Sequence, residues 1–287
     1  MKTILLTGAS GFIGKNFVDK YKEKYFFFLL LKKNLKKSRV LKKNKNIRYI
    51  FFKKNKEIPN LVSGLKINYF INLATYHTNE NDTKSLEKII DSNISFPTMV
   101  LGSINKKNLN KVITIGSMHE HCQNKKFSPK NIYASSKGAL SCFVHFYKEK
   151  FKSINFYNLK FYETYSRNDK RKKIIPTLVK NFRNGKITKI LSPKLLLNFI
   201  HIDDVAKAMD IIIKKKIKSG NYLIKSKNYT NIVKLINQFN RNSKKKIKFK
   251  VFNTSCTNIT YRITPLPLWR QTRYIEKDLK KIFYEKN

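Results

Sequence analysis

The sequence predicts a doubly wound α/β fold, in which helices cover both faces of a parallel sheet. Short apolar runs alternate with longer segments whose apolar residues recur at helical spacing. A glycine-rich turn follows the first apolar run directly. The chain has 287 residues, of which 41% are hydrophobic, so it is long enough to bury the core that such a sheet needs.

The first half of the chain alternates regularly between strands and helices. Strands are expected at residues 2–6, 25–31, 47–52, 69–73, 112–115 and 154–161. Helices are expected at residues 12–21, 86–104 and 133–151. In the last of these, Leu140, Phe143, Val144 and Tyr147 are expected to face the core. Residues 32–46 are basic and poor in apolar side chains, which indicates a loop with a weak helix.

The second half is less regular. Helices are expected at residues 174–182, 202–213, 232–239 and 275–283, and strands at residues 222–224 and 247–252. Asp203 or Asp204 is expected to cap the second of these helices. We therefore divide the chain into a sheet domain, residues 1–161, and a smaller C-terminal α/β region, residues 162–287. Residues 199–215 are expected to return to the sheet domain.

The charge is strongly basic. Lys and Arg number 62 against 17 Asp and Glu, which leaves a formal net charge of +45. Such a charge has two interpretations: a polyanionic partner, such as nucleic acid or an anionic membrane, or a compositional bias toward lysine. The lysines are spread along the whole chain, whereas a nucleic-acid-binding protein usually concentrates them on one face or tail. We favour the compositional interpretation and expect no specific nucleic-acid partner.

Cysteine usage and hydropathy indicate a cytoplasmic protein. Cys122, Cys142 and Cys256 have no metal-like spacing and are typical of reduced thiols. The longest apolar run, residues 25–31, is too short to span a bilayer. Gly8, Ser10 and Gly11 interrupt the first apolar run too early for a secretory signal.

Residues 7–14 form the first candidate site. They read TGASGFIG and lie between the first strand and the first helix. Gly8 permits a sharp turn, Gly11 lets a diphosphate approach the backbone, and Gly14 lets the helix pack on the sheet. The free N–H groups of the helix N-terminus attract phosphate. This pattern is typical of a Rossmann dinucleotide site, although an ordinary strand–turn–helix is the alternative and the spacing differs from G-x-G-x-x-G.

Tyr133 and Lys137 form the second candidate site. They are four residues apart, so they share one face of the helix. An ammonium beside a phenol is expected to lower the phenol pKa, which suits proton transfer to or from a carbonyl or hydroxyl oxygen. Ser117, just after a strand, is placed to bind the same oxygen. The alternative is a surface Tyr and Lys on an amphipathic helix, but the two candidate sites together favour a dinucleotide enzyme.

No metal site is expected. His119 and His121 have a spacing found in some metal sites, but no further histidine or acidic cluster completes a ligand set. A role in a surface loop or an active-site loop is therefore the better interpretation. His201, Asp203 and Asp204 also lie close together in the sequence, where they are better explained as the entry to a helix.

Several motifs in order resemble the extended short-chain dehydrogenase/reductases of the nucleotide-sugar epimerase/dehydratase group. Residues 7–14 resemble the family's TGxxGFxG loop, and residues 72–74 (NLA) its N/H-L-A segment. Residues 159–171 (LKFYETYSRNDKR) resemble LRxxNxYGPxDxR, and residues 197–205 (LNFIHIDDV) resemble RDFIHVDDV. Within the group the chain is most similar to 4-ketoreductases such as paratose and abequose synthases. The likeness covers nearly the whole length.

The resemblance implies the following roles. Ser117, Tyr133 and Lys137 match the catalytic Ser, Tyr and Lys. The cofactor is expected to contact Gly8, Ser10, Gly11, Phe12, Ile13, Gly14, Lys32, Lys33, Leu73, Ala74, Tyr133 and Lys137. The substrate, a nucleoside-diphosphate sugar, is expected to contact Thr75, Asn93, Met118, Glu163, Arg171 and Asn198, and residues 162–287 mainly bind it. The family also implies a homodimer formed by the helices at residues 86–104 and 133–151.

Two departures from the family pattern bear on the reaction. Dehydratases carry an Asp-Glu pair after the catalytic Thr or Ser, where this chain has Met118 and His119, with Glu120 one step later. Members that prefer NAD usually end their second strand with an acid, where this chain has Lys32 and Lys33, with more cations in residues 36–37. Cations favour a 2′-phosphate, so NADP(H) is expected over NAD(H), with the general abundance of lysine as the alternative explanation.

The sequence is therefore compatible with three functions. The favoured one is an NAD(P)-dependent oxidoreductase that reduces a 4-keto (di)deoxy nucleoside-diphosphate sugar by hydride transfer, with Tyr133 as proton donor. The second is a nucleotide-sugar 4-epimerase that keeps NAD bound. The third is a non-catalytic dinucleotide-binding or RNA-binding protein, against which the presence of Ser117, Tyr133 and Lys137 argues.

Overall fold

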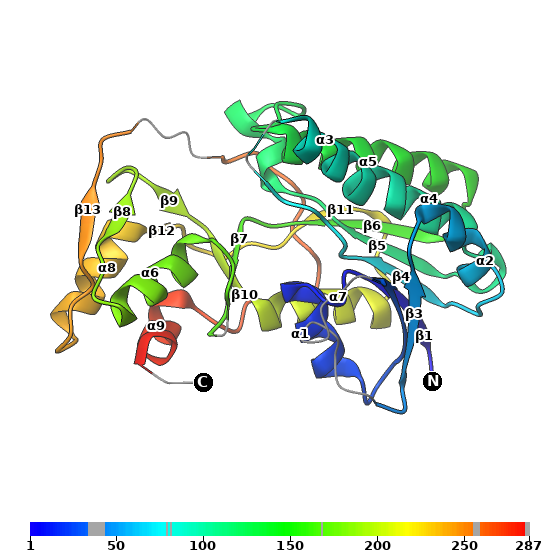
Figure 1. Cartoon of the computed structure of the whole chain (residues 1–287), viewed down its shortest axis with the longest axis horizontal. Coiled ribbons are helices and arrows are strands. Elements are labelled where there is room, and N and C mark those ends of the chain that lie inside the picture. The colour runs from blue at the N-terminus through cyan, green and yellow to red at the C-terminus, as the bar shows by residue number, and fades with distance from the viewer. Residues whose placement is uncertain (34–43, 79, 81, 168, 255–258, 285–287) are drawn as a thin grey trace.

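A seven-stranded parallel sheet organises the computed structural model (Figure 1). Its strands are β1 (Thr3–Thr7), β2 (Phe26–Lys32), β3 (Ile47–Phe52), β4 (Tyr69–Asn72), β5 (Lys111–Ile115), β6 (Asn155–Lys160) and β11 (Gly220–Leu223). They lie in the order β11-β6-β5-β4-β1-β2-β3, and every neighbouring pair is parallel. The predicted doubly wound fold is confirmed. The structure describes residues 1–33, 44–78, 80, 82–167, 169–254 and 259–284.

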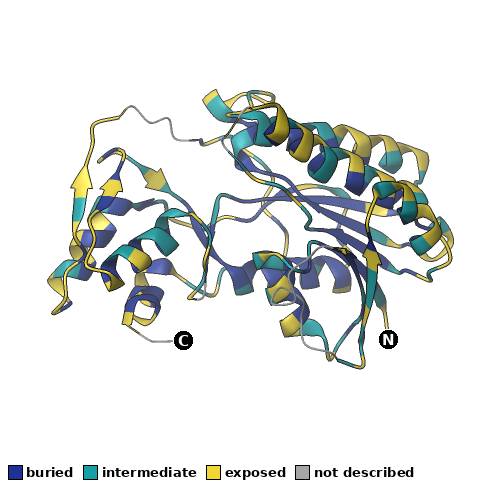
Figure 2. Cartoon of the chain, viewed as in Figure 1, coloured by how far each residue is buried: buried dark blue, intermediate teal, exposed yellow. Residues whose placement is uncertain are grey.

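Helices cover the two faces of the sheet. One face carries α1 (Phe12–Tyr21) and α7 (Ile202–Lys214), and the other carries α2 (Ile58–Val62), α3 (Thr83–Ile90), α4 (Phe96–Ser103) and α5 (Ile132–Lys150). Alternate strand residues point to opposite faces, so Leu6 and Leu29 pack with α1 and α7, whereas Leu5 and Leu30 pack with α4 and α5. Figure 2 shows the central strands buried between these two layers.

The second half of the chain forms a smaller lobe beside the carboxyl ends of the strands (Figure 1). Its helices are α6 (Ile174–Arg183), α8 (Ile232–Arg241) and α9 (Ile275–Tyr284), which share a third apolar cluster. Its short strands are β7 (Glu163–Tyr165), β8 (Thr188–Ile190), β9 (Leu196–Leu197), β10 (Phe199–His201), β12 (Thr230–Asn231) and β13 (Phe249–Val251). They pair as β10 with β7, β12 with β9, and β13 with β8. The division into domains at residue 161 stays a prediction.

The expected single helix over residues 86–104 is interrupted. A π-helical turn at Asp91–Ser95 separates α3 from α4. Pro97 follows this turn and has no N–H to donate to the carbonyl of Asn93, so the regular ladder cannot continue. π-helical turns inside α-helices are frequent at functional sites. The Asn93 side chain is fully buried within this turn.

The cap expected for α7 was also wrong. Its N-cap residue is His201, whose Nδ1 accepts a hydrogen bond from the backbone N–H of Asp203 at 3.2 Å. Asp203 and Asp204 both lie inside the first turn. Asp204 is fully buried, and its carboxylate accepts backbone hydrogen bonds from Thr272 and Arg273, which attaches the C-terminal segment to the start of α7.

The loop expected at residues 32–46 and the core face expected for α5 are considered next to the described structure. Residues 34–43, most of the loop expected at 32–46, lie outside the described residues. Phe143, expected to face the core from α5, is instead 43% exposed, while Leu140 and Val144 on the same helix are buried.

Within the part of the chain that the structure describes, no helix is both long and apolar enough to cross a membrane.

Candidate active site

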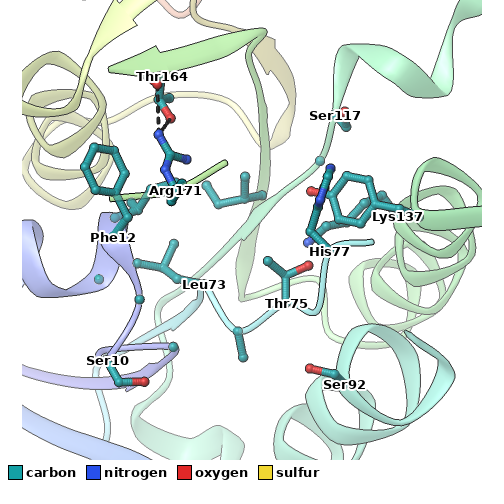
Figure 3. Close-up of a pocket in the computed structure, with 18 of the residues that line it drawn as sticks. Ser10, Phe12, Leu73, Thr75, His77, Ser92, Ser117, Lys137, Thr164 and Arg171 are labelled. Carbon is teal, nitrogen blue, oxygen red and sulfur yellow. Dashed lines mark hydrogen bonds between the residues drawn. The ribbon is translucent and has the colours of Figure 1, made fainter. Parts of the chain in front are cut away.

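One large cavity lies at the carboxyl ends of the parallel strands. Its volume is about 790 Å³, within the range of small-molecule and cofactor sites. Residues from the loops after β1, β4 and β5, from α5, and from the smaller lobe line it. In Figure 3, Phe12 and Arg171 lie on one side of the cavity, and His77, Lys137 and Ser117 lie on the other. Ligands of open α/β sheets bind at this edge.

The glycine loop brings α1 against the sheet without intervening side chains. Gly8 has φ +72°, and a Cβ on it would lie 2.4 Å from the carbonyl carbon of Leu73. A Cβ on Gly14 would lie 2.3 Å from the carbonyl oxygen of Gly8. The N-cap residue of α1, Gly11, has no side chain to satisfy the first N–H groups of the helix. The loop is therefore a cradle that only glycine leaves open, and it fits the diphosphate of a dinucleotide.

Lys32 lines the far end of this cavity, at the end of β2. Its ammonium pairs with a carboxylate oxygen of Asp91 at 2.9 Å, and Asn55 donates to the other Asp91 oxygen at 2.6 Å. The ion pair is half-exposed. Lys33 is exposed and does not line the cavity. Of the two lysines expected to contact the cofactor, the structure thus places only Lys32 at the site, with an acidic neighbour that the sequence did not indicate.

The N-terminus of α5 positions Tyr133 and Lys137. Asn131 caps this helix by accepting the N–H of Ala134 at 3.0 Å, so Tyr133 falls in the first turn. Lys137 follows one turn later, and both side chains line the cavity. The Lys137 Nζ lies 5.7 Å from the centroid of the Tyr133 ring. Ser117, two residues after the end of β5, lines the same cavity, so the three predicted catalytic residues meet there.

Lys137 was expected to lower the pKa of the Tyr133 phenol, but the pKa is raised. Burial raises the pKa of Tyr133 to about 12, although a hydrogen bond with Thr75 opposes the shift. Burial also lowers the pKa of Lys137 to about 8, so its own positive charge is destabilised. The Nζ faces the ring rather than bonding the hydroxyl, and no hydrogen bond joins it to any residue that the structure describes. Desolvation is thus the main cause of both pKa shifts.

Two histidines face the same reaction space. The His77 ring packs against the Tyr133 ring with a centroid distance of 4.6 Å. Partial desolvation lowers the pKa of His119 and of the more exposed His77, so both are neutral near pH 7. The Nδ1 of His119 is buried and has no hydrogen-bond partner among the described residues. Sequence reasoning assigned His119 to a surface or active-site loop and did not single out His77, because a lone histidine in a loop carries no periodic signal.

The smaller lobe contributes charged groups to the other wall. The Glu163 carboxylate pairs with Lys173 at 3.3 Å. The Arg171 guanidinium lies 3.8 Å from the centroid of the Phe12 ring and is held by Asp169 and Thr164 (Figure 3). This contact joins the start of α1 to the smaller lobe on one side of the cavity. Thr75, Glu163 and Arg171, three of the predicted substrate contacts, therefore line the site.

The other three predicted substrate contacts do not line the cavity. Asn93 is fully buried and bonds the backbone of Tyr76 and the hydroxyl of Ser136. Asn198 is fully buried and bonds the backbone of Ser226. Met118 is fully buried in a small apolar cluster. The structure places these side chains beneath the site, where they support the loops that form it.

The described residues hold no cluster of three or more His, Cys, Asp or Glu side chains that could bind a metal ion.

The remaining predicted cofactor residues all line the cavity, namely Gly8, Ser10, Gly11, Phe12, Ile13, Gly14, Leu73 and Ala74. Lys172 and Lys173 line it as well but were not selected from the sequence, since they lie among many other lysines.

Comparison with known proteins gives concordant results. A family model described as the NAD dependent epimerase/dehydratase family matches residues 4–224. The CDP-abequose synthase of Yersinia pseudotuberculosis is 26% identical over 220 residues, which cover 76% of this chain and 75% of the relative. The CDP-abequose synthase of Salmonella muenchen is 25% identical over 222 residues, which cover 77% and 73% of the two chains.

Solved structures share the fold. A mutant of the UDP-glucuronic acid 4-epimerase from Bacillus cereus, in complex with UDP-4-deoxy-4-fluoro-glucuronic acid and NAD, superposes with a TM-score of 0.83 at 17% identity and covers 98% of each chain. The dTDP-glucose 4,6-dehydratase from Bacillus anthracis, in complex with NAD, superposes with a TM-score of 0.78 at 18% identity and covers 99% of this chain and 96% of that one.

The burial of Lys137 leads to a prediction about the free energy of unfolding. Its pKa in the folded chain lies below the ordinary value of 10.5, so protonation opposes folding at neutral pH, by an amount on the order of 3 kcal/mol. Lys137→Met is expected to raise the free energy of unfolding at pH 7. The advantage shrinks as pH rises from about 8 toward 10.5, because the parent protein then loses the buried charge.

Urea denaturation of the parent protein and of Lys137→Met at pH 7 and pH 9.5 measures this difference. Lys125→Met, at an exposed position, serves as the matched control and should change stability little at either pH. A parent protein that is more stable than Lys137→Met at pH 7, by a margin independent of pH, would contradict the assignment.

Proposed function

Because the chain belongs to the NAD dependent epimerase/dehydratase family, we propose that it reduces a 4-keto (di)deoxy nucleoside-diphosphate sugar. Family membership confirms the resemblance seen in the sequence and makes the chain a nicotinamide-dependent enzyme of nucleotide sugars. One observation carries the proposal that the reaction is a ketone reduction. Ser117, Tyr133 and Lys137 line the same cavity as the glycine cradle. The CDP-abequose synthase relatives support it, since the sequence resembles 4-ketoreductases of that kind.

The chain's own groups suit a reduction. The nicotinamide supplies the hydride when the cofactor is bound. Tyr133 stays protonated near neutral pH, because burial raises its pKa, so it can donate a proton to the oxygen of a ketone. Ser117 can orient that oxygen with its hydroxyl. Lys137, held beside Tyr133, would stabilise the phenolate that remains after proton donation.

Dehydration is disfavoured by the residues after Ser117. Met118 is buried away from the cavity, and His119 is neutral near pH 7. Glu120, the remaining acid, pairs with Lys160 and does not line the cavity. None of these three positions therefore presents a carboxylate to a sugar. A 4-epimerase remains the alternative, and net consumption of the cofactor distinguishes it from a reductase.

A panel of 4-keto nucleoside-diphosphate sugars incubated with NADPH or NADH tests the proposal. We expect stoichiometric loss of nicotinamide absorbance with at least one of them. Tyr133→Phe is expected to lose at least about 100-fold in kcat, because it removes the proton donor, while it still binds the cofactor. Tyr284→Phe, on α9, serves as the control. Sugar isomerisation without net loss of reduced nicotinamide would support the epimerase instead, and full activity of Tyr133→Phe would overturn the role of Tyr133.

For the cofactor, we propose NADP(H) over NAD(H). The half-exposed pair between Lys32 and Asp91 contributes at most about 1 kcal/mol, so a 2′-phosphate can draw the ammonium away from the carboxylate. NADPH is therefore expected to bind more tightly than NADH. Asp91→Asn frees Lys32 and is expected to increase this preference by about two- to fivefold.

Fluorescence titration of each reduced cofactor measures both affinities. Asp19→Asn, which removes another partly exposed acid that pairs with Lys22, is the control and should leave the ratio unchanged. Tighter binding of NADH by the parent protein would defeat the proposal for NADP(H), and a ratio unaffected by Asp91→Asn would show that Lys32 does not meet the cofactor.

We further propose that the chain forms a homodimer through α4 and α5. Phe143 and Phe146 on α5 are 43% and 58% exposed. A second cavity, of about 430 Å³, lies between these helices and is lined by Met99, Phe143 and Tyr147. Apolar exposure on adjacent helices favours burial against a second copy.

Sedimentation equilibrium of Phe143→Lys tests this dimer. The variant is expected to sediment as a monomer, because a charge placed in the apolar contact would be desolvated on association. Phe127→Lys, at a position that is 72% exposed in a loop, is the matched control and should remain dimeric. A monomeric parent protein, or a dimeric Phe143→Lys, would contradict the proposal.

We place the enzyme in the cytoplasm, as its cysteines suggest. Among the described residues, Cys122 and Cys142 are free thiols. Free thiols are typical of reducing compartments.

A further inference from the structure

A buried ion pair lies directly behind Ser117. The Lys160 ammonium, at the end of β6, is 2.7 Å from Oε2 of Glu120. Both side chains are only 6% exposed, and neither residue lines the cavity. Replacement of a buried ion pair by apolar groups is often neutral or stabilising, so stability alone does not explain this one.

The second oxygen of Glu120 holds the backbone of Ser117. The Ser117 N–H donates to Oε1 of Glu120 at 2.6 Å. Gly116 makes this approach possible, because a Cβ at that position would lie 2.8 Å from the same oxygen. One carboxylate thus joins the turn that carries Ser117 to the end of β6. Loss of this acceptor would leave the Ser117 N–H buried without a partner.

The network continues into the loop after Ser117. Lys160 also donates to Nε2 of His121 at 2.8 Å, so the proton of the neutral ring lies on Nδ1, which donates to the carbonyl of Lys126 at 2.8 Å. The His121 ring stacks on Tyr261 with a centroid distance of 4.3 Å.

We propose that Glu120 and Lys160 are positioning residues that hold Ser117 against the carbonyl oxygen of the substrate. This inference rests on the proposed reduction. Glu120 acts as the backbone acceptor, and Lys160 neutralises its charge so that the carboxylate can remain buried. The negative charge of Glu120 opposes the lowering of the Lys137 pKa by burial and adds to the raising of the Tyr133 pKa.

Two double variants separate the acceptor from the charge. Glu120→Gln with Lys160→Met removes both charges but keeps an amide oxygen that can accept the Ser117 N–H. Glu120→Leu with Lys160→Met removes the charges and the acceptor. We expect the Leu/Met variant to lose about 10- to 100-fold in kcat relative to Gln/Met, with KM for the keto sugar changed by less than about threefold. Equal kcat values, or a loss confined to KM, would overturn the proposal.

A glycine variant can disrupt the hydrogen bond between the Ser117 N–H and Glu120 without changing any charge. Gly116→Ala forces the Glu120 oxygen away from its place and is expected to lower kcat in the same way. Gly64→Ala, where a Cβ meets nothing within 4 Å, is the control. Full kcat in Gly116→Ala would count against the proposal, and this variant provides the test if the Leu/Met variant does not fold.

Hydrogen exchange of the Ser117 amide provides a readout that is independent of turnover. The amide is expected to be protected in the parent protein and in Gln/Met, and to exchange at least about tenfold faster in Leu/Met. Unchanged protection in Leu/Met would overturn the positioning role. If the parent protein turns over no keto sugar, the proposed function fails while this measurement still decides whether Glu120 holds Ser117.

Discussion

The close backbone contact among Gly8, Gly14 and Leu73 is the constraint on which the site depends. Side chains at either glycine would overlap the backbone of β4's end or of the loop itself. With no side chains there, the N-terminus of α1 reaches the carboxyl edge of the sheet. The parallel strands β4 and β5 end at the same edge, so the loops that follow them lie opposite this helix start. The cradle and the reacting groups therefore share one cavity.

The site combines this rigid frame with costly burial of polar groups. At the start of α5, Lys137 is buried and Tyr133 is partly buried, and desolvation favours the neutral form of each side chain. Behind them, Glu120 and Lys160 form a buried ion pair. A folding core would not need these groups. Their presence at one end of an otherwise apolar sheet is typical of a functional site, where chemistry opposes stability.

The sequence alone predicted the strands and helices whose residue patterns lie within a short stretch of the chain. The apolar runs of β1, β2, β3 and β6 and the four-residue spacing of Tyr133 and Lys137 are visible in short windows of sequence. What sequence could not predict depends on distant partners. The short strands β7 and β10 exist only because they pair with each other, and Lys32 meets Asp91 only because β2 ends beside the π-helical turn.

The same limit explains the substrate contacts. Thr75, Glu163 and Arg171 line the cavity, whereas Asn93 and Asn198 turn inward, because buried backbone groups of neighbouring loops require their amides. Resemblance to a family motif transfers the position of a residue but not the direction of its side chain. The pKa of Tyr133 was likewise beyond sequence reasoning, since the depth of burial decides it.

A crystal structure of the chain with a nicotinamide cofactor and a nucleoside diphosphate bound would test the central claim most directly. We predict that the cofactor diphosphate lies on the backbone N–H groups of residues 10–13, and that the nicotinamide ring lies beside Tyr133 and Lys137. A cofactor bound elsewhere, or a nicotinamide ring separated from the Tyr133 hydroxyl by the wall of the cavity, would contradict it.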